Sequence, residues 1–483
     1  MRFFAIFRIL GVLLMLFSLS MWPPIFVNWY YQDDSAWPFL ISFCLTLLVG
    51  FCMWGLGKQR QQELRPRDGF LVVTLFWTVL CVFASLPLMI AKHPHIGFTN
   101  AMYETVSGFT TTGSTILTDF STLSHAILYY RQQLQFLGGM GIIVLAIAVL
   151  PMLGVGGMQL YRAETPGPIK DSKLTPRITS TAKTLWFIYL GLIIVCAISY
   201  WLAGMTPFDA ICESYSTVAT GGFSIHSNSF AFYNSDLIDC IGILFMVLGG
   251  ANFALFYAAL NEMNFKVFWK DEEFRAYIKI LLGFSLISCV VLLFHNVFHD
   301  SRHAFIESLF NISSLMTTTG FIDAPFDSWP SFLPILVMLG AMIGGCAAST
   351  SGGIKVIRIL LLYKQTRREV ERLIHPRAVI PVKFGGQVLP DHVVQSMWGF
   401  IAAFLVIFFV LILALMATGL DLRTAFGAVA ANISNAGAGI GAVAHHFHDV
   451  SDVAKWLLIV AMLAGRLEIF TILVLFSPSF WRK

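Results

Sequence analysis

The stretch SGFTTTG (residues 107–113) lies between two long apolar segments of the chain. Threonine and glycine are weak helix formers, and irregular polar backbone is not tolerated against lipid. Aligning the remaining sequence on this stretch gives three further copies: STVATGG (216–222), SLMTTTG (314–320) and ANISNAG (431–437). Each copy ends in glycine. The recurrence predicts a fold built from four repeats.

The composition indicates a membrane protein. Of the 483 residues 57% are hydrophobic and 12% charged, whereas soluble proteins carry about 25% charged residues. The formal net charge of +4 is too small to suggest nucleic-acid binding. The 8 cysteines are scattered without a CxxC pair, so they are interpreted as packing residues and not as a disulfide framework or zinc site.

Ten apolar segments are long enough to cross a bilayer, which takes about 20 residues. They lie near residues 5–28, 38–57, 69–91, 124–153, 184–204, 236–260, 278–298, 330–362, 394–419 and 454–480. The first resembles a signal peptide, but it is long and lacks a small-x-small cleavage site. We therefore expect an uncleaved first span, and two spans ahead of the first repeat.

Basic residues gather in alternate connections of the chain. These connections are residues 58–67, 154–183, 261–279 and 355–393, and both chain ends are basic as well. Because lysine and arginine are retained on the cytoplasmic side, both termini are expected in the cytoplasm.

The four connections on the opposite side are too long and too apolar for simple loops. They span residues 92–123, 205–235, 299–329 and 420–453. Each begins with an amphipathic stretch and continues into a Ser/Thr/Asn/Gly cluster, which is typical of re-entrant half-helices that line a watery cavity.

The expected fold is an all-α polytopic membrane protein. It has four pseudo-symmetric span–pore helix–span repeats around a central ion pore, plus two N-terminal transmembrane helices. The expected units are residues 1–68 for the N-terminal pair and 69–183, 184–277, 278–392 and 393–483 for the four repeats.

Four short extended segments around one axis could replace the hydration shell of an alkali cation with backbone carbonyls. Glycine suits this role because it adopts backbone angles forbidden to other residues. The alternative is that the small residues only ease helix packing. Four copies in register, each after an amphipathic half-helix, make that alternative the weaker one.

These residues resemble the Trk/Ktr/HKT superfamily of potassium transporters over the full chain. The similarity is carried by GFTTTGST (108–115), FYAALNEMNFKVFW (256–269), IGGCAASTSGGIKVIRILLL (343–362), WGFIAAF (398–404) and AGRLEIFTILVLFSPSFW (464–481). The resemblance implies a potassium-selective pore within one chain, assembled as a homodimer in the bacterial inner membrane. It also implies a cytosolic TrkA-type ring that binds ATP, ADP or NADH and gates the pore. No cofactor is implied in this chain apart from potassium ions.

The resemblance assigns the potassium-binding filter to four short runs. They are Thr110, Thr111, Thr112 and Gly113; Ala219, Thr220, Gly221 and Gly222; Thr317, Thr318, Thr319 and Gly320; Ser434, Asn435, Ala436 and Gly437. Glycine at the end of all four runs favours potassium over sodium. The Tyr-Gly ending of the four-subunit potassium channels is missing, so a shorter and less discriminating filter is expected. The fourth run departs most, because it lacks threonine.

A break is expected in the span after the third run, where glycine is frequent enough to disfavour a continuous helix. The residues are Gly344, Gly345, Cys346, Ala347, Ala348, Ser349, Thr350, Ser351, Gly352 and Gly353. In the superfamily an intramembrane loop at this place obstructs the conduction path, so these residues are assigned to a gate. A glycine-rich packing face is the alternative.

Arg466 lies within the last apolar segment and is interpreted as an electrostatic barrier facing the pore. The alternative is that it pairs with helix-end carbonyls. Glu468, two residues on, points to another face of a helix.

Two further clusters leave their role open. Glu104, Glu213 and Glu307 recur in the expected pore helices and either attract cations or pair locally. The sequence HHFHD (445–449) is interpreted as a solvated loop in preference to a zinc site.

The functional expectation is potassium uptake through a gated pore, and not an enzyme. An ion-coupled potassium symporter or a less selective cation pore is the alternative. A secondary carrier is disfavoured because the repeats share one orientation, and no catalytic constellation is evident within the spans.

Overall fold

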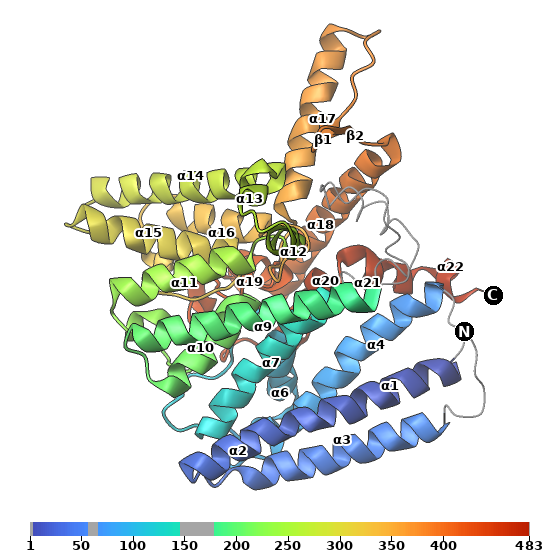
Figure 1. Cartoon of the computed structure of the whole chain (residues 1–483), viewed down its shortest axis with the longest axis vertical. Helices are drawn as coiled ribbons and strands as arrows, with labels where there is room; N and C mark the ends of the chain where they lie inside the picture. The colour runs from blue at the N-terminus through green and yellow to red at the C-terminus, as the bar shows by residue number, and fades with distance from the viewer. Residues whose placement is uncertain (1–2, 57–65, 145–177, 483) are drawn as a thin grey trace.

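The computed structural model describes residues 3–56, 66–144 and 178–482 of the chain. These residues form a helical molecule whose one sheet is the short hairpin β1 (Lys383–Phe384) and β2 (Gln387–Val388). The described ends of the chain lie near each other on one side (Figure 1).

The N-terminal pair consists of α1 (Phe3–Ser18), the short η1 (Leu19–Met21), α2 (Trp22–Tyr31) and α3 (Ala36–Leu56). α1 and α3 lie side by side in Figure 1 and approach closely at two glycines. A Cβ atom at Gly11 would lie 2.6 Å from the Gly50 carbonyl oxygen, so the backbones touch here.

The four repeats follow in order along the chain. Repeat 1 contains α4 (Pro66–Ala84), α5 (Leu86–Ile90), α6 (Phe98–Phe109) and α7 (His125–Val144). Repeat 2 contains α9 (Ile178–Leu202), α10 (Pro207–Ala219), η5 (Ser229–Phe232), α11 (Asp236–Gly249), α12 (Phe253–Asn261) and α13 (Lys266–Lys270). Repeat 3 contains α14 (Glu272–Phe294), α15 (Ser301–Met316), η6 (Phe326–Ser328), α16 (Leu333–Ile343) and α17 (Val356–Ile374). Repeat 4 contains α18 (Asp391–Ala417), α19 (Leu422–Ile433), η7 (Gly441–Val443), α20 (Asp452–Arg466), α21 (Ile469–Phe476) and α22 (Pro478–Trp481).

The four pore helices, α6, α10, α15 and α19, stop at the Thr/Gly clusters. Three of them start at a side-chain N-cap: Thr206, Asp300 and Asp421 each accept a backbone N–H of the first turn. From Ala101 to its last residue α6 is buried despite its polar side chains. The pore helices are therefore interior elements surrounded by the longer spans.

Two of the expected spans, 236–260 and 454–480, are each divided by a sharp bend that the sequence analysis did not predict. α11 and α12 meet at 91°, and α20 and α21 meet at 113°. The first bend arises because Asn252 caps a new helix by accepting the Ala254 N–H. At the second bend Glu468 has a φ of 60°, which a helix cannot continue through.

The break expected near 344–353 is present, since α16 ends at Ile343 and α17 begins at Val356. Among the described residues six helices are long and apolar enough to cross a membrane, or up to 8 if each bent pair counts as one span. Of the expected span 124–153 the structure describes α7, and the rest lies outside the described residues, as does most of the basic connection 154–183.

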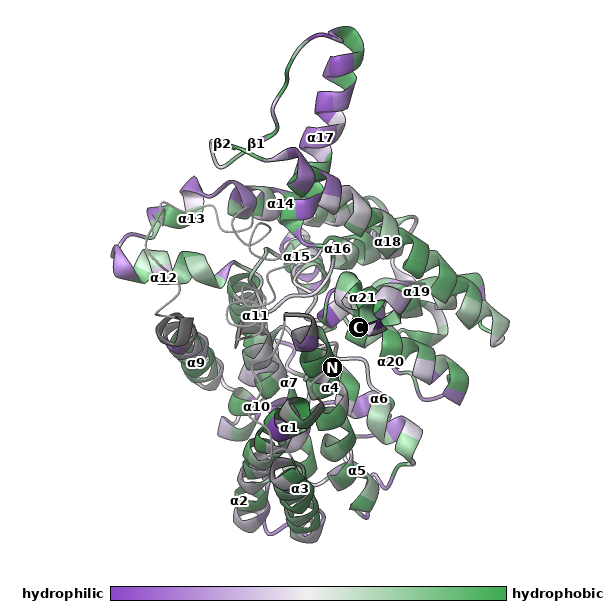
Figure 2. Ribbon diagram, turned by 90° about the vertical axis from the view of Figure 1, so that its right-hand side faces the viewer, coloured by the Kyte–Doolittle hydropathy of each residue, from purple (hydrophilic) through white to green (hydrophobic). Residues whose placement is uncertain are grey.

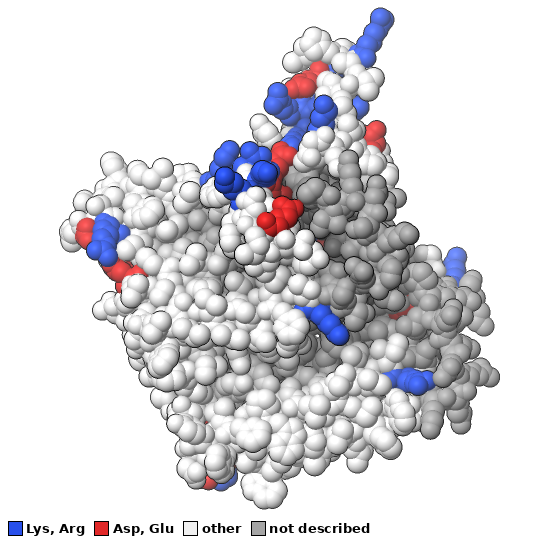
Figure 3. Space-filling model, viewed as in Figure 1, with Lys and Arg blue, Asp and Glu red and all other residues white. Residues whose placement is uncertain are grey.

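α17 projects from the helical body (Figure 1) and is mostly hydrophilic in Figure 2. Lysine and arginine side chains gather over it in Figure 3. α17 itself carries Lys364, Arg367, Arg368 and Arg372. The basic connection 355–393 thus begins with one projecting helix and returns through the β1–β2 hairpin to the start of α18.

Candidate functional site

The last four residues of each repeated stretch are called here the glycine segments: 110–113, 219–222, 317–320 and 434–437. All four have the same backbone pattern. The second residue lies in the left-handed region with φ between 49° and 57°: Thr111, Thr220, Thr318 and Asn435. The final residue also has positive φ: Gly113, Gly222, Gly320 and Gly437. The fourth segment shares this register, although it lacks threonine.

A hydrogen bond recurs at the third position of every segment. Its N–H donates over 2.8 Å to a carbonyl near the end of the pore helix: Thr112 to Ser107, Gly221 to Ser216, Thr319 to Ser314, and Ala436 to Ala431. Alternation of right- and left-handed residues places successive N–H groups on one side of the backbone. The N–H group at this position therefore ties each segment to its own pore helix.

The four segments close into a ring. A Cβ atom on each final glycine would overlap the carbonyl oxygen of the third residue in the next segment: Gly113 with Gly221, Gly222 with Thr319, Gly320 with Ala436, and Gly437 with Thr112. The last contact returns to the first segment. Glycine is required here both by its positive φ and by this close approach.

Side-chain contacts make the first and third segments alike and set the fourth apart. In the first and third, the outer hydroxyls of the Thr-Thr-Thr run bond each other over 2.7 Å, Thr110 with Thr112 and Thr317 with Thr319. The fourth segment instead sends the Asn435 amide to Thr112 Oγ1 over 2.9 Å and to the Met462 carbonyl over 3.0 Å. The ring therefore has a fourfold backbone and only a pseudo-symmetric lining.

The loop 344–353 lies against the ring at the end where the pore helices stop. Thr350 Oγ1 accepts from Thr220 Oγ1 over 3.2 Å, and the Gly352 N–H donates to Thr318 Oγ1 over 2.6 Å. A Cβ atom at Gly352 would lie 3.0 Å from Asn435 Cβ. The loop thus contacts the left-handed residue of three segments directly.

Arg466 connects the loop to the remaining segment. Its Nη2 donates to Thr111 Oγ1 over 2.7 Å and to the Thr350 carbonyl over 2.9 Å. Arg466 is buried and is the last residue of α20. Glu468 does not share this site, because it accepts from the buried Arg358 over 2.8 Å.

The loop also replaces hydrogen bonds that the bend between α11 and α12 leaves open. In a continuous helix the Phe253 N–H would donate to the Gly249 carbonyl. Here the Phe253 N–H donates to the Ala348 carbonyl over 3.0 Å, and the Gly249 carbonyl accepts from Thr350 Oγ1 over 3.0 Å. The loop and the bend therefore stabilise each other.

Glu273, near the start of α14, holds the loop and the first turn of α17, and it was missed by sequence reasoning. Its Oε1 accepts from the Ala347 N–H over 2.7 Å and from the Ile357 N–H over 3.2 Å. Glu273 is 1% exposed. The signal available in the sequence was an acidic residue beside a span, which does not reveal a partner 74 residues away.

The pore-helix glutamates pair locally in the structure. Glu104 accepts from Thr115 Oγ1 and the Ile116 N–H, and it forms a buried ion pair with Arg131 at 2.8 Å. Glu213 accepts from Ser224 Oγ and the Ile225 N–H. Each carboxylate therefore fixes the chain just after a glycine segment, which favours local pairing as the role of these two side chains.

Glu307 is not equivalent to the other two glutamates. The position matching Glu213 in the third repeat is Asn311, one turn further along α15. The carboxyl group of Glu307 lies near that of Asp323, in the loop after the third segment, and burial raises the pKa of Asp323. The apparent recurrence of three glutamates was thus two equivalent residues and one displaced by a turn.

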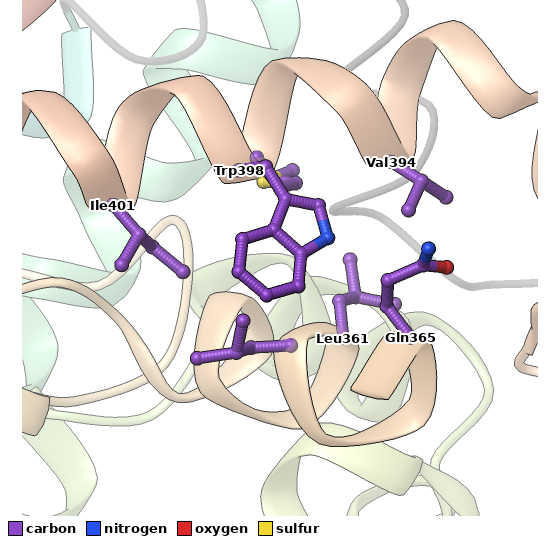
Figure 4. A pocket seen from close by; sticks show the side chains of 7 residues that line it. Leu361, Gln365, Val394, Trp398 and Ile401 are labelled. Carbon is purple, nitrogen blue, oxygen red and sulfur yellow. The ribbon is translucent and has the colours of Figure 1, made fainter. Parts of the chain in front are cut away.

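Two other features lie away from the ring. Among the described residues no group of three or more His, Cys, Asp or Glu side chains is placed to hold a metal ion, and His448 Nδ1 lies 3.2 Å from the Ile116 carbonyl oxygen. A small pocket between α17 and α18 is lined mainly by apolar side chains, including Leu361, Trp398 and Ile401 (Figure 4). That lining does not suit a cation.

Comparison with known sequences identifies the family to which this chain belongs. The sequence profile of the TrkH family, described as cation transport protein, matches residues 37–483. The chain belongs to the TrkH family of cation transport proteins. The resemblance to the wider superfamily and the expected fold class are confirmed, and a family of transport proteins agrees with the expectation of a non-enzyme.

Members of the TrkH family align with the whole chain. The chain is 52% identical to the Trk system potassium uptake protein TrkH of Vibrio parahaemolyticus and 48% identical to that of Escherichia coli, over 100% of both chains in each case. It is 42% identical to the Trk system potassium uptake protein TrkG of Escherichia coli, covering 98% of this chain and 97% of the relative.

The fold is similar as well. The crystal structure of the potassium transporter TrkH from Vibrio parahaemolyticus superimposes with a TM-score of 0.93 at 49% identity, covering 100% of both chains. The chain is accordingly a multi-pass membrane protein built of four repeats after an N-terminal helical pair.

Proposed function

We propose that this protein takes up potassium across the bacterial inner membrane through the ring of glycine segments. The observation that carries the proposal is the closed ring, in which each glycine abuts a carbonyl of the next segment. Hard alkali cations prefer oxygen ligands, and backbone carbonyls at fixed spacing can replace their hydration shell. The names of the relatives, which are potassium uptake proteins, support potassium as the cation.

The proposed gate is the 344–353 loop together with Arg466. The loop contacts the inner end of the ring, and Arg466 adds a buried positive charge there. A cation leaving the ring meets both a steric block and electrostatic repulsion, and the repulsion is strong because the site is secluded from water. Opening therefore requires that the loop move away.

Control of that movement is proposed to come from a cytosolic TrkA-like ring that binds ATP, ADP or NADH. The projecting basic helix α17 continues directly from the loop. A partner that binds and moves α17 would therefore also move the loop. Anionic lipid headgroups explain the charge of α17 equally well. We further propose that both termini are cytoplasmic and that the protein works as a homodimer.

The test is ion flux into liposomes containing the purified full-length protein with defined potassium, sodium and proton gradients. Passive potassium flux that follows the electrochemical gradient and exceeds sodium flux is the expected result. Potassium accumulation against that gradient would favour a proton- or sodium-coupled symporter. Sodium flux equal to potassium flux would favour the less selective pore.

A further inference from the structure

The second glycine segment has a contact that the others lack, and it comes from Gln135 of α7. Gln135 Nε2 donates to the Gly221 carbonyl over 2.7 Å, and its Oε1 accepts from the Phe223 N–H over 3.2 Å. The two bonds bracket Gly222, the final residue of the segment. They also fix the orientation of the amide, since the reverse orientation would place donor against donor.

Gln135 occupies space that a side chain of the segment fills elsewhere. The third residue is Thr112, Thr319 or Ala436 in the other segments and Gly221 in this one. A Cβ atom at Gly221 would overlap the Gln135 amide. Gly221 has no positive φ, so glycine at this position is explained by the amide and not by the backbone.

The neighbouring residues on the same face of α7 extend the contact along the chain. Gln132 Nε2 donates to the Phe223 carbonyl over 2.8 Å, and Arg131 Nη1 donates to the Ser224 carbonyl over 3.3 Å. In repeat 3 the corresponding helix, α16, buries only apolar residues and glycine. The backbone around Gly222 is therefore held from behind by amide and guanidinium donors.

We propose that Gln135 is a specificity-determining positioning residue for the ion filter, which rests on the function proposed above. The Gly221 carbonyl lies between the first two segments, where it abuts Gly113. Held by the amide, this oxygen keeps a spacing that suits potassium. Without the amide, the Gly221 carbonyl oxygen can move toward a smaller ion, and the free-energy cost of binding sodium in place of potassium falls.

The experiment compares Gln135→Met and Gln135→Ala in the full-length protein. Methionine keeps the length of the side chain and removes both hydrogen bonds, while alanine removes the side chain. The measurement is the potassium-to-sodium permeability ratio from reversal potentials in liposomes under bi-ionic conditions. We expect both variants to lower the ratio by about threefold to tenfold, since each loses two buried hydrogen bonds.

The matched control is Gln133→Met. Gln133 lies on the same helix, is also buried, and donates over 2.9 Å to the Ser20 carbonyl of the N-terminal pair. It should leave the ratio unchanged. An unchanged ratio in both Gln135 variants, or an equal decrease in Gln133→Met, would overturn the proposal.

A second arm remains informative if Gln135→Met alone folds poorly. Gly221→Ala should displace the amide and lower the ratio, whereas adding Gly221→Ala to Gln135→Ala should cause no further decrease, because the methyl group enters vacated space. If the decreases in the permeability ratio caused by Gly221→Ala and Gln135→Ala add up in the double variant, the proposed role of Gln135 would be contradicted. Failure of the proposed function itself is distinguishable, because the unmutated protein would then show no potassium preference.

Discussion

The glycine segments have nearly the same structure in all four repeats, whereas the helices that follow them differ from one repeat to another. The segments have one backbone in four copies, with the same left-handed positions and the same hydrogen bond to the pore helix. The following helices take three different forms. α7 carries a polar buried face, α11 and α20 bend sharply into their successors, and α16 gives way to a loop.

This difference corresponds to two physical requirements of the proposed function, one for binding the ion and one for gating. If the ring binds potassium as proposed, replacing the hydration shell needs equivalent carbonyls from every segment, and the shared backbone supplies them. A gate needs one element with two arrangements, and identical elements in all four repeats would crowd one another at the axis. Among the described residues, a loop that contacts the ring in this way comes from the third repeat, and segments of the other repeats provide contacts for it.

The largest effect is expected from breaking the ring itself. Gly222→Ala places a Cβ atom against the Thr319 carbonyl and forces alanine to a φ of 79°. The left-handed conformation alone costs roughly 1–2 kcal/mol. We expect potassium flux per folded protein in liposomes to fall at least about tenfold.

Gly283→Ala in α14 is the control, because its Cβ atom would meet nothing within 4 Å. Normal flux in Gly222→Ala would show that the ring is not the conduction path.

The next largest effect is expected from removing the positive charge of Arg466, which contacts the ring. Arg466→Ala removes the hydrogen bonds to Thr111 and to the Thr350 carbonyl. Bonds from a charged donor are worth about 1.5–3 kcal/mol, so the closed loop loses much of its advantage. Unstimulated potassium flux should rise about tenfold.

Arg466→Lys, which keeps the charge without the forked geometry, should lie between alanine and the unmutated protein. A potassium flux in Arg466→Ala that is equal to or lower than that of the unmutated protein would contradict the proposal that Arg466 is an electrostatic barrier.

A smaller effect is expected at the anchor of the loop. Glu273→Ala removes the acceptor for the Ala347 and Ile357 N–H groups. Each bond contributes about 1 kcal/mol, so unstimulated flux should rise about threefold to tenfold. Glu273→Gln keeps one oxygen acceptor and should stay near the unmutated flux; equal effects of both substitutions would argue for charge and against the hydrogen bonds.

The smallest effect tests whether the first and third segments are equivalent. Thr110→Val and Thr317→Val each remove one hydroxyl pair of the same 2.7 Å length. We expect small and equal changes in the potassium-to-sodium permeability ratio, of about twofold. A large change in one and none in the other would show that the first and third segments are not interchangeable.

Sequence reasoning succeeded where the signal is local. Gly113 and its three counterparts could be aligned by spacing, and Gly437 could be placed although its segment has no threonine. The break near Gly344 followed from glycine frequency. The bends at Asn252 and Glu468 were missed, because a single capping residue or one positive φ inside an apolar run leaves hydropathy unchanged.

The partners of charged residues were harder to predict. Glu307 was grouped with Glu104 and Glu213 by residue type, and only the structure shows that it lies one turn away from their register. Arg466 could be recognised as unusual, yet its contacts with Thr111 and Thr350 join three distant parts of the chain. Glu273 gave no signal of its contact with the loop.

The sequence by itself determined the membrane class, the four repeats and the positions that need glycine, because hydropathy, period and backbone freedom are local properties. The tertiary structure decided that the ring closes, which side chains touch it, and that the loop binds it at the end where the pore helices stop. Those facts depend on contacts between residues far apart in the chain. Gln135 illustrates the difference: its amide faces Gly221 only because α7 packs against the second repeat.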